Sequence, residues 1–116
     1  MATEPLVELI EEFAEVADEH LDALERLDEE IANSLSARIF SLYHKIIRHD
    51  EGREALLVLL ESHNNAVAGM AAVFSLRYDP ERSLPVLKRL SALPGLMGFR
   101  ATVAVERWDK GEWNLD

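Results

Sequence analysis

Apolar residues recur every three or four positions along most of the chain, and this spacing predicts amphipathic helices. The first helix is expected to begin near Pro5 and to end near 18–20. The second is expected over about 22–49, with a break near 33–36, where small polar side chains compete for backbone hydrogen bonds. The inner stripe of this second helix is Ile31, Leu35, Ile39, Leu42 and Ile46.

Four shorter helices are expected in the rest of the chain, each marked by a capping residue or a helix-breaking pair. Asp50 is the expected N-cap of the third helix, and Asn65 is the expected N-cap of the fourth, which is rich in alanine and glycine. Asp79-Pro80-Glu81 opens the fifth helix in the order cap, proline and acid. Pro94-Gly95 separates it from the sixth, which is expected over about 96–109.

The C-terminal end of the chain is expected to pack back on the last helices. Gly111 suits the left-handed residue just past a helix end. Trp113 is expected to fold inward, because a ring of its size gains much from burial. No alternating strand pattern occurs, so the sequence predicts an all-α fold of about six helices. The expected inward residues of the sixth helix are Leu96, Phe99, Val103 and Ala104.

The last four helices read as two copies of one unit, at 50–77 and 79–109, each a leucine-rich helix, a turn and a helix rich in alanine or valine. The period of roughly 30 residues is at the short end for helical-hairpin repeats. The stretch 56–67, LLVLLESHNNAV, followed by Ala71-Ala72, resembles a HEAT-type repeat. It departs from the repeat consensus at Ala68, where an arginine is common.

The whole arrangement is similar to a bacterial family of short HEAT-like helical proteins, a domain of unknown function. Beyond the repeat, the shared features are the acidic first helix with Phe13, the long helix around 31–46, Asp79-Pro80-Glu81 and Trp108-Asp109-Lys110-Gly111. The resemblance implies a right-handed α-α superhelix of HEAT-like hairpins and no activity. The length predicts a single domain over 1–116, and the repeat pattern divides it into capping helices at 1–49, two hairpins at 50–109 and a tail at 110–116.

The negative charge is concentrated near the N-terminus. The formal net charge is −10, and residues 1–33 alone carry twelve acidic side chains against one base, Arg26. Such a field attracts a basic partner and repels nucleic acid and anionic lipid. A solvated face that only keeps the protein in solution is the simpler interpretation of the same charges. The candidate partner-binding residues on this face are Glu8, Glu11, Glu12 and Glu15.

Residues that carry catalysis or bind metals form no recognisable pattern. The chain has no cysteine, and His44 and His49 are five positions apart, which places them on different sides of a helix. No nucleophile elbow and no phosphate-binding glycine loop occurs. We therefore predict no enzyme activity, no cofactor and no metal. A signal peptide and a long apolar run are also absent from the sequence, so a cytoplasmic protein without a membrane helix is expected.

Three functional hypotheses follow. The first is a module that binds a protein, and the partner is basic if the acidic face is the contact. The second is a small-ligand-binding protein or enzyme with a site between helices. The third is self-association through the alanine-rich helix or Trp113. The residues considered for a site of the second kind are Tyr43, His44, His63 and Arg77.

Overall fold

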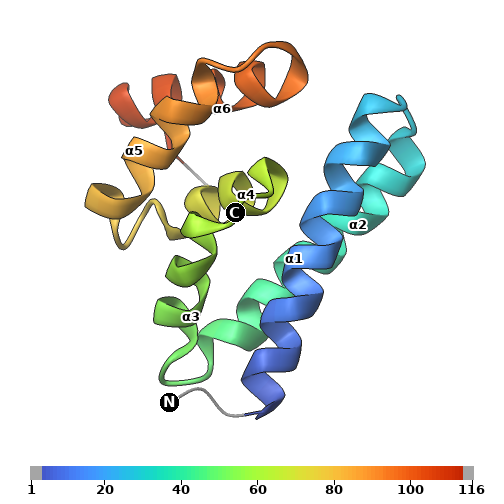
Figure 1. Cartoon of the computed structure of the whole chain (residues 1–116), viewed down its shortest axis with the longest axis vertical. Helices are drawn as coiled ribbons and strands as arrows, with labels where there is room; N and C mark the ends of the chain where they lie inside the picture. The colour runs from blue at the N-terminus through green and yellow to red at the C-terminus, as the bar shows by residue number, and fades with distance from the viewer. Residues whose placement is uncertain (1–3, 114–116) are drawn as a thin grey trace.

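Six α-helices and one short 3-10 helix make up most of residues 4–113, the part of the chain that this computed structural model describes. In chain order they are α1 (Glu4–Glu25), α2 (Glu29–Ile47), α3 (Gly52–Val58), η1 (Leu59–Glu61), α4 (Asn65–Ser75), α5 (Pro80–Ser91) and α6 (Gly95–Asp109) (Figure 1). No strand occurs in these residues, so the predicted all-α fold is confirmed. Their helices include none that is long and apolar enough to cross a membrane.

Two helical pairs lie on either side of α4. α1 and α2 run antiparallel and pack along their length, and α5 packs on α6 (Figure 1). α4 lies between these pairs and contacts α1, α3, η1, α5 and α6. α3 and η1 carry the chain from the end of α2 to the start of α4. The relative position of the two pairs is therefore set mainly by how each packs on α4.

Small side chains allow α4 to take this central position. Eight of its eleven residues are buried, and five of these are alanine or glycine. A Cβ atom at Gly69 would lie 3.0 Å from the methyl carbon of Met97 and 3.2 Å from Cδ1 of Leu90. The absence of a side chain at this position lets α5 and α6 approach the α4 backbone closely. The small buried residues of α4 are Ala66, Ala68, Gly69, Ala71 and Ala72.

Two hydrophobic clusters meet at α4. The first joins α4 to α1, α2 and α3, and its centre is the ring of Phe74, whose centroid lies 4.7 Å from that of Tyr43, 5.1 Å from Phe40 and 5.8 Å from Phe13. The second cluster joins the other side of α4 to α5 and α6. Its members include Leu57, Leu60, Ala71, Ala72, Leu76, Leu87 and Ala104. Because α4 contributes to both, it connects the two halves of the core.

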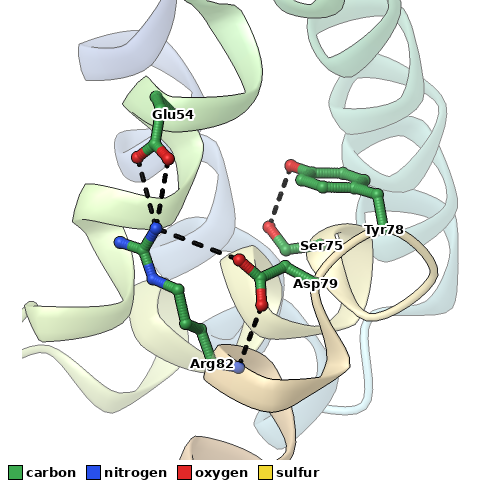
Figure 2. Close-up of polar contacts among 5 residues, drawn as sticks. All are labelled: Glu54, Ser75, Tyr78, Asp79 and Arg82. Atoms are coloured by element: carbon green, nitrogen blue, oxygen red, sulfur yellow. Dashed lines mark hydrogen bonds and ion pairs between the residues drawn. The ribbon is translucent and has the colours of Figure 1, made fainter.

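The turn between α4 and α5 is held by polar contacts that also reach α3 (Figure 2). The Asp79 carboxylate accepts a hydrogen bond from the backbone N–H of Arg82 at 3.1 Å and caps α5. The guanidinium of Arg82 donates to Glu54 of α3 at 3.2 Å. The hydroxyl oxygens of Ser75 and Tyr78 lie 3.1 Å apart. The predicted start of the fifth helix at Asp79 is confirmed.

The boundary between the first two helices differs from the prediction. α1 continues past 18–20 to Glu25, because the helical spacing of apolar side chains continues beyond that point, and α2 begins only at Glu29. α2 is also continuous through 33–36, where a break was expected. Ile31, expected inside, is 43% exposed because it lies in the first turn of α2, at the tip of the hairpin.

The turn between α1 and α2 is a Schellman motif with leucine in the place that glycine usually takes. Leu27 has a left-handed backbone with a φ of 60°. Its N–H donates to the carbonyl of Leu24 at 3.1 Å, and the N–H of Asp28 donates to the carbonyl of Ala23 at 2.9 Å. The Asp28 side chain then caps α2 by accepting from the N–H of Ile31 at 3.1 Å.

Two predicted caps are wrong by one residue. Glu51 precedes α3 in place of Asp50, because the chain makes one more turn in which the N–H of Gly52 donates to the carbonyl of His49 at 2.9 Å. Asn64 caps α4 in place of Asn65. Its side-chain oxygen accepts hydrogen bonds from the backbone N–H groups of Ala66, at 2.9 Å, and Val67, at 3.3 Å. Both differences shift a helix start without changing the order of the helices.

Replacing Leu27 with glycine should stabilise the protein by about 1 kcal/mol, because glycine adopts the left-handed backbone without the steric cost that a side chain adds. Urea unfolding followed by circular dichroism measures this change. Arg26→Gly is the matched control, because Arg26 has no positive φ and glycine should give no gain there. If the free energy of unfolding of Leu27→Gly were equal to or lower than that of the unsubstituted protein, the backbone strain at Leu27 would be contradicted.

Candidate functional site

The predicted partner-binding residues of α1 lie on the surface, but one of them has a partner within the chain. Glu8, Glu11 and Glu15 are exposed. Arg38 of α2 donates a hydrogen bond to Glu12 at 2.7 Å, and this contact raises the pKa of Arg38. Part of the acidic charge of α1 therefore joins the two helices of the hairpin, and the other three carboxylates remain exposed.

The four polar residues considered for a site between helices do not share a cavity. Tyr43 is half-buried and its ring packs on Phe74, while the ring of the exposed His44 lies 5.5 Å from that of Tyr43. His63 is exposed in the turn before α4, and Arg77 is exposed just after α4. The structure brings Tyr43 and His44 together, and none of the four lines the main cavity described next.

A cleft of about 340 Å³ lies between α1 and α6, with α4 as its floor. We call it the central cleft. Its floor is apolar and is formed by Gly69, Met70 and Val73 of α4. Ala17 of α1 and Ala101 of α6 also line it. The small side chains that let helices pack on α4 also leave this space, because α1 and α6 do not fill it.

One face of α6 forms the wall and rim of the central cleft. Arg100, Val103, Ala104 and Arg107 line it, and their spacing of three, four and seven positions places them on one side of a helix. Both arginines reach the solvent. Phe99, expected inside the core, is 67% exposed at this rim, because small residues form the buried side of α6 and leave the phenyl ring at its edge.

The charges that line the central cleft are of one sign. Arg100 and Arg107 line it together with His20, and no Asp or Glu of the described chain does so. Neither arginine forms an ion pair with another residue of 4–113. This pattern contrasts with the net charge of −10. The cleft is therefore a local site of positive charge in an acidic protein.

His20 is held neutral in the wall of the central cleft. Its side chain is only 8% exposed, and burial lowers its pKa, with a further lowering by the positive charge of Arg100. Burial also lowers the pKa of Arg100, which stays charged because arginine titrates far above neutral pH. Within the cleft, the charged Arg100 thus lies beside an imidazole whose pKa is lowered.

Trp113, which follows α6, lines the central cleft. α6 ends in a Schellman motif, in which Gly111 has a φ of 72° and the N–H of Glu112 donates to the carbonyl of Arg107 at 2.8 Å. The chain then turns back so that the half-buried Trp113 lines the cleft. Both expectations, a left-handed Gly111 and an inward Trp113, are confirmed. The indole Nε1 of Trp113 is buried without a hydrogen-bond partner among the described residues.

The sequence contained one signal for this site that its interpretation did not use. Arg100 and Arg107 are seven residues apart, and this spacing alone places them on one face of a helix. His20 was missed because the first helix was expected to end there. Across residues 4–113, no group of three or more His, Asp or Glu side chains is placed to hold a metal ion.

His20 should titrate below the ordinary histidine value of 6.5. Between its folded pKa and 6.5, the unfolded chain binds a proton at this residue that the folded chain does not, so stability should fall as the pH drops below 6.5. A titration of the imidazole resonances by NMR measures the pKa. Urea unfolding of His20→Gln should lack this part of the pH dependence, and a midpoint at or above 6.5 would show that His20 is not desolvated.

Comparison with known proteins identifies the fold and leaves the function open. No protein-family model and no curated protein matches the sequence. The structure is similar to the crystal structure of the protein RPA1889 from Rhodopseudomonas palustris CGA009, with a TM-score of 0.85 and 24% sequence identity. The match covers 96% of this chain and 93% of that chain. At this identity the similarity shows a shared fold, and the chain is therefore similar to that protein in architecture over nearly its whole length.

Proposed function

We propose that the protein binds a small molecule with an apolar body in the central cleft. The observation that carries this proposal is a cavity of about 340 Å³ with an apolar floor and a few polar groups at its wall and rim. Its volume and its lining are typical of small-molecule sites, in which apolar contacts supply affinity and a few polar groups orient the ligand. The exposed Phe99 beside the opening adds apolar surface that a bound molecule can cover.

Binding rather than catalysis fits the groups that line the cleft. His20 is the one residue there that can exchange a proton near neutral pH, and no serine or carboxylate of the described chain lines the cleft beside it. A nucleophile and an orienting acid, which a histidine needs for acyl transfer, therefore have no candidate at this site. We accordingly propose a carrier or sensor of a small molecule.

Binding of a basic protein through Glu8, Glu11, Glu12 and Glu15 stays a second proposal. Its support is the exposure of three of these carboxylates. The pairing of Glu12 with Arg38 reduces the charge that this face offers, so we rank it below the cleft.

We also propose that α3 to α6 form two stacked HEAT-like hairpins with α1 and α2 as the cap. The support is the order of packing, in which α3 lies on α4, α4 on α5, and α5 on α6. In such a superhelix, the space between the cap and the last hairpin is a natural place for a binding site.

Trp113 provides a direct test of ligand binding. In a Trp108→Phe background, Trp113 is the one tryptophan left, and it lines the central cleft. Titration with octanoate and with octanol should change its fluorescence to saturation, because an apolar chain in the cleft replaces water beside the indole. Val103→Phe, which adds bulk at the cleft wall, should weaken binding of both probes by about tenfold.

The matched control is Val58→Phe, which adds the same bulk at an exposed position of α3 that does not line the cleft. Circular dichroism confirms that each variant is folded. The control should bind both probes as the unsubstituted protein does. No saturable change with either probe, or equal binding by the two phenylalanine variants, would refute binding in the central cleft.

A further inference from the structure

We infer that the molecule bound in the central cleft is an anion, a carboxylate with an apolar body, and that its charged group binds Arg100 next to His20. This inference rests on the proposed function and adds the chemical class of the ligand and the position of its charge. It follows from three features of the cleft: the sign of its charges, the position of Arg100 next to His20, and a hydrogen-bond donor that has no partner among residues 4–113.

The distribution of charge points to an anion. The chain has 22 acidic and 12 basic residues, so a carboxylate beside an arginine would be the ordinary arrangement. Elsewhere the structure follows it, because Glu12 pairs with Arg38 at 2.7 Å and Glu54 pairs with Arg82 at 3.2 Å. The cleft is lined by two arginines and by no carboxylate of residues 4–113. A ligand carboxylate would supply the missing charge.

Arg100 is the better of the two arginines for this contact. Arg100 lines the central cleft and also the smaller neighbouring hollow that His20 lines, so it lies next to the imidazole, and it forms no ion pair with another residue of 4–113. Arg107 lies two turns further along α6, so one small anion does not need both residues. A guanidinium can hold a carboxylate through two parallel hydrogen bonds, which also fixes the direction of the apolar body. That body would then extend over Met70 and Val73 of the floor.

The indole of Trp113 favours a ligand that accepts hydrogen bonds. Its Nε1 is buried and has no partner among residues 4–113, and the residue lines the same cleft. An indole N–H can only donate, so it can be satisfied by an acceptor such as a carboxylate oxygen but not by an ammonium group. An amine of the same length would therefore meet an unpaired donor and the positive charge of Arg100.

The test compares three probes with the same apolar chain: octanoate, octanol and octylamine. Isothermal titration calorimetry on the full-length protein should give octanoate an affinity about tenfold higher than octanol, with octylamine the weakest, because a charged hydrogen bond adds to the apolar contact. Arg100→Gln should abolish the preference for octanoate over octanol. Arg107→Gln is the matched control, since it removes the same charge from the same face of α6, and it should keep most of the preference.

His20 gives a second readout, which reports where the charge lies. Arg100 of α6 is the charged group that faces it, and the other residues around it, Ser36 of α2 and Met70 and Val73 of α4, do not titrate. Octanoate bound at Arg100 should offset the arginine charge and raise the pKa of His20, whereas octanol should not. NMR of the imidazole resonances measures this difference.

The outcomes separate the inference from the proposed function. Equal affinity for octanol and octanoate, or a preference that survives Arg100→Gln, would overturn the anion site while leaving an apolar ligand site in place. If none of the three probes bound the protein, both the anion site and the proposed binding of a small molecule would be refuted. If sedimentation showed a dimer, and if dimer formation prevented octanoate from binding, a second copy of the chain would occupy the cleft. This result would also overturn the inference.

Discussion

The close packing of helices on α4 is the constraint on which the rest of the structure depends. Most of α4 is buried, and its alanines and Gly69 bring neighbouring backbones close enough for two hydrophobic clusters to meet on one short helix. Phe74 supplies the bulk that this helix otherwise lacks, and its ring binds α1 and α2 through three aromatic contacts. The positions of the two outer helical pairs follow from these contacts, because each pair packs on α4.

The same constraint leaves the central cleft. Ala66 and Gly69, on the part of α4 between α1 and α6, are too small to fill the space that these two helices leave, and Met70 and Val73 complete the floor of the cleft. The side chains that line this space come from the faces of α1 and α6 that border it. α1 turns His20 toward it and keeps its carboxylates outside, while α6 turns Arg100 and Arg107 toward it. A positive site thus forms inside a negatively charged protein.

Helical periodicity and capping residues were sufficient to predict the all-α class, the order of the helices and several details at their ends. Asp79 and Gly111 were recognisable because their side-chain chemistry or conformational freedom is specific to one position in a helix end. The turn after α1 was not recognisable, because Leu27 occupies a left-handed position where glycine or asparagine is the usual signal. The N-cap of α4 was misplaced because Asn64 and Asn65 are equally suitable and only the backbone decides between them.

The cleft itself could not be predicted from the sequence, because it depends on the relative placement of residues far apart in the chain. Periodicity places Arg100 and Arg107 on one face of α6, but it does not say that His20 lies across from them. Burial of His20 and exposure of Phe99 are likewise results of helix packing. The acidic face of α1, in contrast, could be predicted from the sequence, because it depends on the spacing of residues within one helix.

The most direct test of the central claim, that the cleft on α4 is a ligand site, is methyl NMR of the protein during titration with octanoate. The methyl groups of Met70, Val73 and Met97 line the cleft, whereas those of Val7 and Val58 are exposed and do not. We expect saturable shifts of the Met70, Val73 and Met97 signals and no change in those of Val7 and Val58. Unchanged Met70, Val73 and Met97 signals, or shifts confined to Val7 and the acidic face of α1, would contradict it.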